Sequence, residues 1–498
     1  MPSDLVIVYH RQPYEEVEGD DGEILYRENK SPNGIVPTLK ALFGKVDHGA
    51  WVAWKEAEDP SNPEFERVVE IEDSFGTYTV SRLPLTSAQV KSFYHVTSKE
   101  AFWPILHSFK ERYNYDPVDW PTFREVNWAF AEAAAREADE AALVWVHDYN
   151  LWLVPGYLRQ LRPDVTISFF HHTPFPAADM FNVLPWREEI VKSLLECDVV
   201  GFHIPRYVAN FTQVARSLFD LEVSRRKPVK ANEQPLGSAL DERSQPTEIT
   251  LAEGRKVTLS ASPVGIDTDF IEQKATSETT IRKLTGIETE KGDGKLILSV
   301  GRTDYTKGGP EQLLAFERLL QRRKDLHGQI RLMHVSVMAN RNMTAYAEIQ
   351  AEVEQLAGRI NGTFGTLEWQ PLAFISQPIP FDDLVAYYRA ADVAWITPLA
   401  DGMNLVCKEY VASRVDGDGV LVLSEFAGAA VELNGAVMTN PFSNRSMDTA
   451  IDQALAMPED ERRDRMSAMR DTVQTADIRA WGDAQLAFGN RAARDSAA

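Results

Sequence analysis

The sequence predicts an α/β protein made of two doubly wound domains. Short apolar runs alternate with amphipathic segments along the chain, which is typical of βαβ units and parallel sheets. The chain has 498 residues, of which 44% are hydrophobic, and this length exceeds what one core usually supports. A Pro/Gly turn at residues 263–267 marks the expected boundary. We therefore expect domains at 1–264 and 265–498, with the last helix able to pack back on the first domain.

The predicted elements of the first domain alternate regularly. The apolar runs predict strands at residues 5–8, 51–54, 143–146, 165–170 and 199–203, and the amphipathic segments predict helices at 123–138, 151–160, 187–196 and 207–221. Two polar stretches do not fit this alternation. The acidic residues 15–23 predict a solvated loop, and the aperiodic residues 224–255 predict a loop or an irregular hairpin.

The second domain follows the same pattern. Strands are predicted at residues 296–300, 330–337, 393–397, 420–424 and 436–439, and helices at 310–323, 345–359, 381–391, 405–414 and 448–456. Ligands of open α/β sheets bind at the carboxyl ends of the strands. Polar residues that directly follow a predicted strand are therefore the first candidates for a site.

Charge and cysteine usage narrow the classes of function. The chain has 52 basic and 74 acidic residues, a net charge of −22, which argues against nucleic acid and anionic membrane surfaces as partners. No apolar run reaches the roughly 18 residues of a membrane span, and residues 1–8 lack the pattern of a secretory leader. The two cysteines have no CxxC or histidine partner, which predicts reduced thiols in a cytoplasmic protein.

Residues 401–410 (DGMNLVCKEY) lie where a predicted strand turns into a predicted helix. An acid, a glycine and an amide at such a turn place backbone N–H groups at a helix N-terminus, where anions and polar ligands bind. Glu409 lies about one helical turn further on and is expected to reach the same ligand.

Residues 301–309 (GRTDYTKGG) follow another predicted strand. Arg302 offers a planar fork and Lys307 a point charge, a pair that suits a diphosphate. The alternative is a solvated loop that carries ordinary charges.

Two further strands of the first domain end in polar residues. Asp148, in the stretch 145–150 (WVHDYN), is placed to orient a hydroxyl or to take its proton, and the alternative is an N-cap of the next helix. The adjacent His171 and His172 suggest a metal site. However, neighbouring side chains on a regular element point apart, so chelation of one metal ion by both histidines is not expected.

Together these motifs resemble the trehalose-phosphate synthase family of retaining glycosyltransferases, glycosyltransferase family 20. The resemblance rests on residues 302–308 (RTDYTKG), 172–176 (HTPFP) and 401–404 (DGMN), and it runs from about residue 6 to about residue 481. Residues 93–107, 184–187 and 202–207 are most similar to its glucosylglycerol-phosphate synthase branch. The resemblance implies a GT-B fold, in which two Rossmann-like domains face each other across a cleft.

The resemblance also implies roles for individual residues. The donor would be bound by Gly34, Arg302, Lys307, Asp401, Gly402, Met403, Asn404, Leu405 and Glu409, and the acceptor by Arg11, Tyr94, Trp103, Asp148 and Arg341. The catalytic set would be Arg302, Lys307, Asp148 and His172. By residue type alone, Tyr94 and Trp103 are more often core aromatics.

Two positions depart from the trehalose-phosphate synthases. Asn340, with Arg341 beside it, stands where they have an arginine that binds the phosphate of glucose 6-phosphate. Ala400 replaces their arginine before the DGMN stretch. The first change weighs against glucose 6-phosphate as the acceptor, and the second changes the charge next to Asp401.

The implied reaction is transfer of glucose from ADP-glucose to the 2-hydroxyl of glycerol 3-phosphate, with retention of the α-anomer and without a metal or other cofactor. The product would be the precursor of a compatible solute, glucosylglycerol. The sequence is compatible with assembly into a homo-oligomer.

One alternative function is that of a trehalose-6-phosphate synthase. Another is a catalytically silent sugar-phosphate sensor, against which the intact Arg302, Lys307, Asp148 and Asp401 count. A dehydrogenase is disfavoured because no GxGxxG turn follows the first strand.

Overall fold

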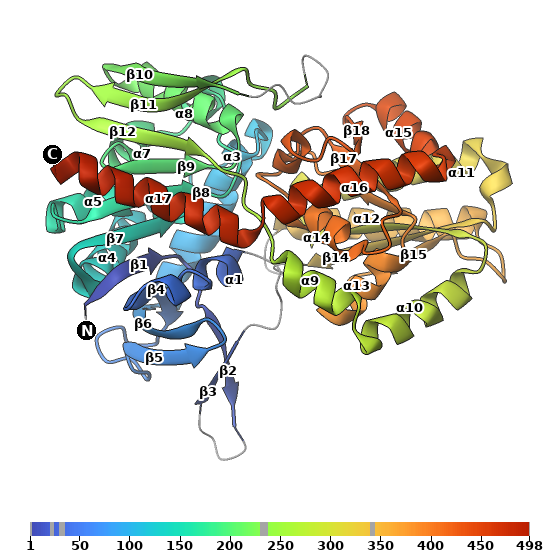
Figure 1. Cartoon of the computed structure of the whole chain (residues 1–498), viewed down its shortest axis with the longest axis horizontal. Helices are drawn as coiled ribbons and strands as arrows, with labels where there is room; N and C mark the ends of the chain where they lie inside the picture. Colours follow the sequence, from blue (N-terminus) through green and yellow to red (C-terminus); the bar gives the residue numbers. More distant parts are fainter. Residues whose placement is uncertain (1, 20–23, 29–34, 230–237, 339–343, 498) are drawn as a thin grey trace. The chain divides into compact units, whose positions relative to one another are not determined.

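A computed structural model describes residues 2–19, 24–28, 35–229, 238–338 and 344–497 of the chain (Figure 1). The chain separates into two compact units. The first consists of Met1–Lys230, Glu242–Pro263 and Arg479–Ala498, and the second of Val264–Ile478 with Ala231–Asp241. Each unit is built around its own sheet.

In the described part of the first unit, ten strands form one sheet in the order β10-β11-β12-β9-β8-β7-β1-β4-β6-β5. Their bounds are β1 (Ser3–Val8), β4 (Gly49–Glu56), β5 (Val68–Asp73), β6 (Gly76–Leu85), β7 (Ala138–His147), β8 (Thr166–His171), β9 (Val199–Phe202), β10 (Leu221–Pro228), β11 (Ser244–Leu251) and β12 (Lys256–Ala261). Every neighbouring pair from β12 to β6 is parallel, and the pairs at the two edges are antiparallel. The carboxyl ends of β1, β7 and β8 therefore meet at one edge of the sheet.

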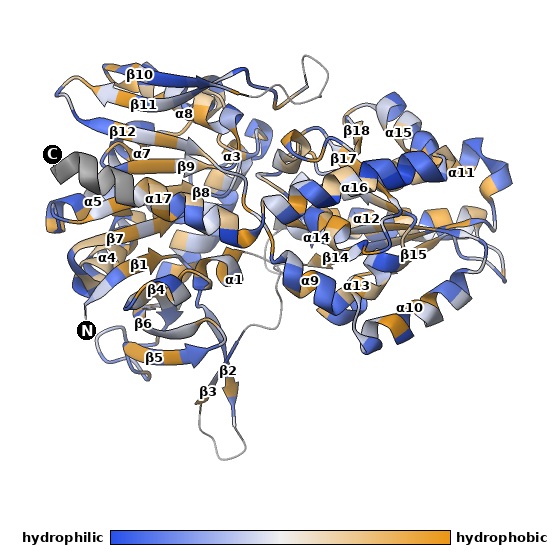
Figure 2. Cartoon of the chain, viewed as in Figure 1, coloured by the Kyte–Doolittle hydropathy of each residue, from blue (hydrophilic) through white to orange (hydrophobic). Residues whose placement is uncertain are grey.

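Burial explains why the central strands form. Strands β8 and β9 are buried along their whole length, whereas β10 is mostly exposed. Figure 2 shows the same contrast, with β8 and β9 hydrophobic and β10 hydrophilic. Parallel strands that are covered on both faces need continuous apolar runs, and these are the runs visible in the sequence.

The helices of the first unit are α1 (Ile35–Lys40), α2 (Ser87–Val90), α3 (Trp103–Leu106), α4 (Trp120–Glu137), α5 (Val154–Leu161), α6 (Ala178–Phe181), α7 (Arg187–Leu194), α8 (Pro205–Leu218) and, from Arg479 onward, α17 (Ile478–Ala497). Short 3₁₀ turns lie at Phe43–Lys45, Lys110–Arg112 and Tyr149–Leu151. Helix α17 is held to this sheet by Trp481, whose ring stacks 5.2 Å from Trp145 and whose Nε1 donates to the Ser262 carbonyl at 3.1 Å.

A π-helix at Lys91–Phe102 joins α2 to α3. At its C-terminal end the backbone hydrogen bond reaches back five residues, from the Trp103 N–H to the Ser98 carbonyl. The Ser98 side chain adds a second bond, since its hydroxyl donates to the Phe93 carbonyl at 2.8 Å. π-helices are rare and are frequent at functional sites.

The second unit contains a sheet that is parallel throughout, with the order β15-β14-β13-β16-β17-β18 among the described residues. Its strands are β13 (Lys295–Thr303), β14 (Ile330–Met338), β15 (Leu372–Ile375), β16 (Val393–Ile396), β17 (Val420–Ser424) and β18 (Val437–Thr439). Its helices are α9 (Thr268–Ala275), α10 (Glu278–Lys291), α11 (Gly309–Arg322), α12 (Thr344–Phe364), α13 (Phe381–Ala390), α14 (Leu405–Ser413), α15 (Asn444–Ala456) and α16 (Glu459–Thr475), with 3₁₀ turns at Tyr305–Lys307, Lys324–Leu326 and Gly428–Val431.

The predicted α/β class is confirmed, and several element predictions need correction. Residues 15–18 of the acidic stretch belong to a strand rather than a loop: β2 (Tyr14–Glu18) pairs with β3 (Ile24–Glu28), and residues 20–23 lie outside the described residues. Residues 224–255 contribute β10 and β11 to the main sheet, which agrees with the hairpin alternative and not with the loop. The helix predicted at 207–221 ends at Leu218, because the chain enters β10 at Leu221.

No helix in the described ranges is both long enough and apolar enough to cross a membrane.

Candidate active site

The first unit brings Asp148 and His172 together at the carboxyl ends of neighbouring parallel strands. Asp148 follows β7, and His172 follows β8. The Asp148 N–H donates to the Phe170 carbonyl at 2.9 Å, and the His172 N–H donates to Asp148 Oδ1 at 3.3 Å. The sheet register therefore fixes the carboxylate beside the histidine backbone.

The backbone of Asp148 is strained. Its φ of 72° and ψ of 164° lie in a region that favours glycine and costs other residues about 1–3 kcal/mol. The side chain caps no helix here, since α5 begins only at Val154, so the N-cap alternative for Asp148 is wrong. Backbone strain at a buried carboxylate is typical of functional positions.

Burial also changes the acidity of Asp148, which is 8% exposed. Desolvation raises its pKa from 3.8 to about 6, and hydrogen bonds from backbone N–H groups and the charges of Lys99 and Arg11 oppose the rise. The carboxyl group is thus ionised near neutral pH but takes up a proton under mildly acidic conditions.

We expect Asp148→Asn to stabilise the protein more at high pH than at low pH. The folded-state pKa of Asp148 lies above the unfolded value, so the wild-type protein loses stability as the pH rises through this window. Asparagine does not titrate. The variant's gain in unfolding free energy should therefore grow by about 1 kcal/mol between about pH 5 and about pH 8.

Calorimetry at the two pH values measures this difference, with exposed Asp47→Asn as the control. Activity with the acceptor should fall at least about tenfold, as expected for loss of the carboxylate that orients the attacking hydroxyl. A gain that is the same at both pH values would show that burial does not perturb Asp148.

The histidines near Asp148 contact different groups. His147 Nδ1 lies 3.1 Å from His172 Nε2, and His203 Nε2 lies 3.1 Å from the His172 carbonyl, to which it can donate. His171 Nδ1 lies 3.0 Å from the Thr173 carbonyl instead. Burial, followed by the neighbouring histidines, lowers the pKa of His172, so its ring is neutral. Within the described residues no three His, Cys, Asp or Glu side chains group as a metal site would require.

The predicted acceptor residues Arg11, Tyr94 and Trp103 also belong to the first unit. Arg11 follows β1, and interaction with Tyr9 and a hydrogen bond with Tyr94 raise its pKa, which places both phenols beside the guanidinium. Tyr94 belongs to the π-helix, and Trp103 begins α3 directly after it. No motif or pattern in the sequence pointed to Lys99, whose Nζ lies 4.0 Å from the centroid of the Trp103 ring.

The second unit brings Lys307 to Asp401. Lys307 Nζ is 2.7 Å from Asp401 Oδ2. The loops that carry the two residues are tied together, since the Leu399 N–H donates to the Thr306 carbonyl at 2.7 Å. Gly308, at φ 70°, lets the loop pass closely: a Cβ there would lie 2.5 Å from the Thr397 carbonyl oxygen.

The turn at residues 401–405 is built around Asn404. Its Nδ2 donates to Asp401 Oδ2 at 3.0 Å, and its Oδ1 accepts from the Cys407 N–H at 3.0 Å, which caps α14. Gly402 and Met403 are buried before the cap, and Leu405 is the first residue of the helix. The predicted strand-to-helix turn is confirmed, with the amide rather than the acid as the N-cap.

We expect Gly428→Ala to destabilise this turn. The Gly428 N–H donates to the Asp401 carbonyl at 3.1 Å, and an added Cβ would lie 2.0 Å from the Gly402 carbonyl oxygen. Backbone must move to admit it, at about 1–3 kcal/mol. Gly358→Ala in α12 is the control, because nothing lies within 4 Å of its Cβ and alanine favours a helix. Equal melting temperatures for the two variants would contradict this reading of the turn.

Glu409 is more enclosed than the sequence implied. Its carboxylate is 3% exposed and accepts a hydrogen bond from the Tyr388 hydroxyl at 3.1 Å. Burial raises its pKa to about 7, against the effect of that hydrogen bond. Its contact with a ligand stays a prediction.

The other predicted residues make no contact with these groups among the described residues. Arg302 is exposed near the end of β13, where its backbone pairs with Val337 of β14, and its side chain makes no hydrogen bond or ion pair with the described part of the chain. Gly34, Asn340 and Arg341 lie outside the described residues.

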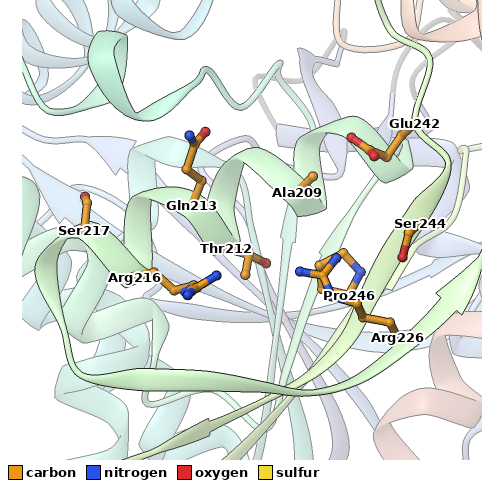
Figure 3. A pocket seen from close by; sticks show the side chains of 9 residues that line it. All are labelled: Ala209, Thr212, Gln213, Arg216, Ser217, Arg226, Glu242, Ser244 and Pro246. Carbon is orange, nitrogen blue, oxygen red and sulfur yellow. The ribbon is translucent and has the colours of Figure 1, made fainter.

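A pocket of about 350 Å³ lies away from these side chains (Figure 3). It is lined by residues of α8, β10 and β11 and the segment before β11, including Arg216, Arg226 and Glu242. None of the predicted site residues lines it, so it does not help to locate the chemistry.

The two sheet-based units match the solved structures of trehalose-6-phosphate synthases, so the chain has the GT-B fold of glycosyltransferases. The family model "Glycosyltransferase family 20" matches residues 3–488, and the chain belongs to this family. It is 50% identical over 483 residues to the glucosylglycerol-phosphate synthase of Synechocystis sp. (strain ATCC 27184 / PCC 6803 / Kazusa), covering 97% of this chain and 96% of that one.

More distant relatives are trehalose-6-phosphate synthases. That of Mycolicibacterium gilvum (strain PYR-GCK) is 39% identical, over 96% of this chain and 92% of its own. The crystal structure of an α,α-trehalose-phosphate synthase (UDP-forming) from Burkholderia vietnamiensis matches with a TM-score of 0.85 and 30% identity, covering 100% of this chain and 99% of that one.

Proposed function

We propose that the protein is a retaining glucosyltransferase that transfers glucose from ADP-glucose to the 2-hydroxyl of glycerol 3-phosphate. The product is 2-O-α-glucosylglycerol 3-phosphate, the precursor of a compatible solute. The observation that carries the proposal is the 50% identity to a glucosylglycerol-phosphate synthase over nearly the whole chain, compared with 39% to a trehalose-6-phosphate synthase. Both cysteines are free and buried, which supports a reducing cytoplasmic setting.

The donor is assigned to the second unit, with Gly34 of the first. Arg302 and Lys307 bind the diphosphate, and the Lys307–Asp401 ion pair at 2.7 Å supports this role because it fixes the ammonium group at the strand ends. Asp401 and the turn Gly402, Met403, Asn404 and Leu405 hold the sugar hydroxyls. Glu409 binds the ribose, which requires the Tyr388 hydrogen bond to leave one carboxylate oxygen available.

The acceptor is assigned to Arg11, Tyr94, Trp103, Asp148 and Arg341. The bond from the glucose C1 to the diphosphate oxygen breaks, and the bond from C1 to the acceptor 2-oxygen forms on the same face. The acceptor proton passes to the leaving diphosphate oxygen, while Arg302 and Lys307 stabilise the developing charge. Asp148 orients the attacking hydroxyl, and His172 contacts the donor glucose.

A second candidate is a trehalose-6-phosphate synthase, which the likeness to the Burkholderia structure favours. Product analysis separates the two. Purified protein with ADP-glucose and glycerol 3-phosphate should release ADP and form a glucoside whose α-linkage to carbon 2 is visible by NMR. Formation of trehalose 6-phosphate from glucose 6-phosphate, with no product from glycerol 3-phosphate, would overturn the proposal.

We expect turnover to be independent of divalent metal, because two basic side chains meet the charge on the leaving diphosphate. Chelator should leave the rate within about twofold, or roughly 0.4 kcal/mol in the barrier. The measurement is ADP release with and without EDTA, after dialysis of protein and substrates. A loss of about tenfold or more that Mg²⁺ restores would show that a metal takes part.

A further inference from the structure

Lys99 lies among the aromatic side chains that the acceptor is assigned to. Its Nζ is 4.0 Å from the centroid of the Trp103 ring, 5.6 Å from that of Tyr94 and 6.0 Å from that of Tyr149. The Trp103 and Tyr149 rings are themselves 6.1 Å apart. A cation within about 6 Å of an aromatic face is attracted to it, so three rings hold this flexible side chain in one place.

The π-helix creates this arrangement. Tyr94 and Lys99 are five residues apart, which places them on different faces of an α-helix. Backbone hydrogen bonds that reach back five residues, as from Trp103 to Ser98, bring positions five apart onto one side of a π-helix. The lysine is thus directed to the aromatic group by the unusual helix.

A second cation and an unpartnered polar ring lie in the same place. Arg11 makes a hydrogen bond with Tyr94, and the His10 ring is 5.4 Å from the Tyr94 ring. His10 is 5% exposed, and neither ring nitrogen has a hydrogen-bond partner among the described residues. Burial, then Arg11 and Lys99, lowers the pKa of His10, so the neutral ring offers one donor and one acceptor.

The chain carries a net charge of −22, but two cations, Lys99 and Arg11, lie beside this aromatic group. Both of them lower the pKa of Asp148, so both act on its carboxyl group. Two fixed cations against one carboxyl group suit a dianion such as a phosphate monoester. A phosphate would interact with both cations more strongly than a neutral sugar would.

We propose that Lys99, together with Arg11, binds the phosphate of the acceptor, and that this pair selects a short phosphorylated alcohol. This inference rests on the proposed function. Both cations lie close to Asp148, which orients the attacking hydroxyl, so the phosphate and the reacting hydroxyl must be near each other. A three-carbon phosphate meets that condition, whereas a hexose places its phosphate further from the reacting end.

The test compares phosphorylated and unphosphorylated acceptors in Lys99→Gln, Lys99→Met and Lys99→Arg. Lys91→Gln is the matched control, since Lys91 is the exposed first residue of the same π-helix. We expect Lys99→Gln to raise KM for glycerol 3-phosphate at least about tenfold, which is about 1.4 kcal/mol. KM for ADP-glucose and kcat/KM for glycerol should stay within about threefold, and the arginine variant should recover most of the loss.

Two outcomes would overturn the role of Lys99: the same loss of kcat/KM with glycerol and with glycerol 3-phosphate in Lys99→Gln, or an unchanged KM for glycerol 3-phosphate. If Lys99→Gln does not fold, Lys99→Met keeps the contacts with the rings and removes the charge. If the wild-type protein does not glucosylate glycerol 3-phosphate, the proposed function fails. In that case, calorimetry of glycerol 3-phosphate binding tests the phosphate site independently of activity, since the wild type should bind it more tightly than Lys99→Met does.

Discussion

Lys307→Ala should lower kcat by a factor of about 10²–10³, which corresponds to about 2.7–4 kcal/mol in the barrier. The ammonium group is held 2.7 Å from Asp401 and needs no rearrangement when charge develops on the leaving diphosphate. An alanine leaves that charge to Arg302 alone. Steady-state kinetics with saturating donor and acceptor measures the loss, with exposed Lys324→Ala in the same unit as the control.

The ion pair offers a sharper form of this test. If Lys307 only kept Asp401 in place, its removal would have no further effect once Asp401 is changed. In a double-mutant cycle, we expect the Lys307→Ala, Asp401→Asn double variant to have a kcat at least about tenfold lower than that of Asp401→Asn alone. The unfolding free energy should change by no more than about 1 kcal/mol, because both partners are partly exposed. A negligible further loss of activity would make the lysine a positioning residue.

The second large effect concerns the choice of acceptor. We expect kcat/KM for glycerol 3-phosphate to exceed that for glucose 6-phosphate by at least about a hundredfold, or roughly 2.7 kcal/mol. Asn340, outside the described residues, stands where the trehalose-phosphate synthases have an arginine, and an amide cannot supply a charged fork to a distant phosphate.

Initial rates with the two acceptors at a fixed concentration of ADP-glucose measure the ratio. Asn340→Arg should lower this ratio, because it restores a charge that can bind the phosphate of glucose 6-phosphate. Asn342→Arg adds the same charge to the same segment and is the matched control, in which the ratio should not change. Comparable rates with both acceptors in the wild-type protein would return the assignment to a trehalose-6-phosphate synthase.

The strands and the residues that end them were predictable from the chain. Strands β1, β7, β8, β13 and β16 are apolar runs, and parallel strands covered on both faces require such runs. Polar residues directly after a buried strand therefore stand out, which is how Asp148, His172 and Asp401 were found. The family followed from motifs at these same points, and the match over residues 3–488 confirms it.

Several features of the site had no signal of this kind. The strands β10 and β11 pair at the sheet edge; β10 is mostly exposed, β11 is partly buried, and neither has an apolar period, so only their pairing shows that they are strands. Asp148 has a positive φ and donates its N–H to the Phe170 carbonyl of the neighbouring strand, a contact that no local pattern indicates. Asn404 caps α14 and also donates to Asp401, which pairs with the distant Lys307.

The sequence by itself determined the fold class, the family and the charged residues at the strand ends, because burial and local turn chemistry act over a few neighbouring positions. Only the tertiary structure decided which of these residues meet. The Lys307–Asp401 pair joins positions 94 residues apart, and its formation depends on packing between distant segments that no local pattern records. The π-helix brings Lys99 towards Tyr94, five residues away, which α-helical periodicity does not predict.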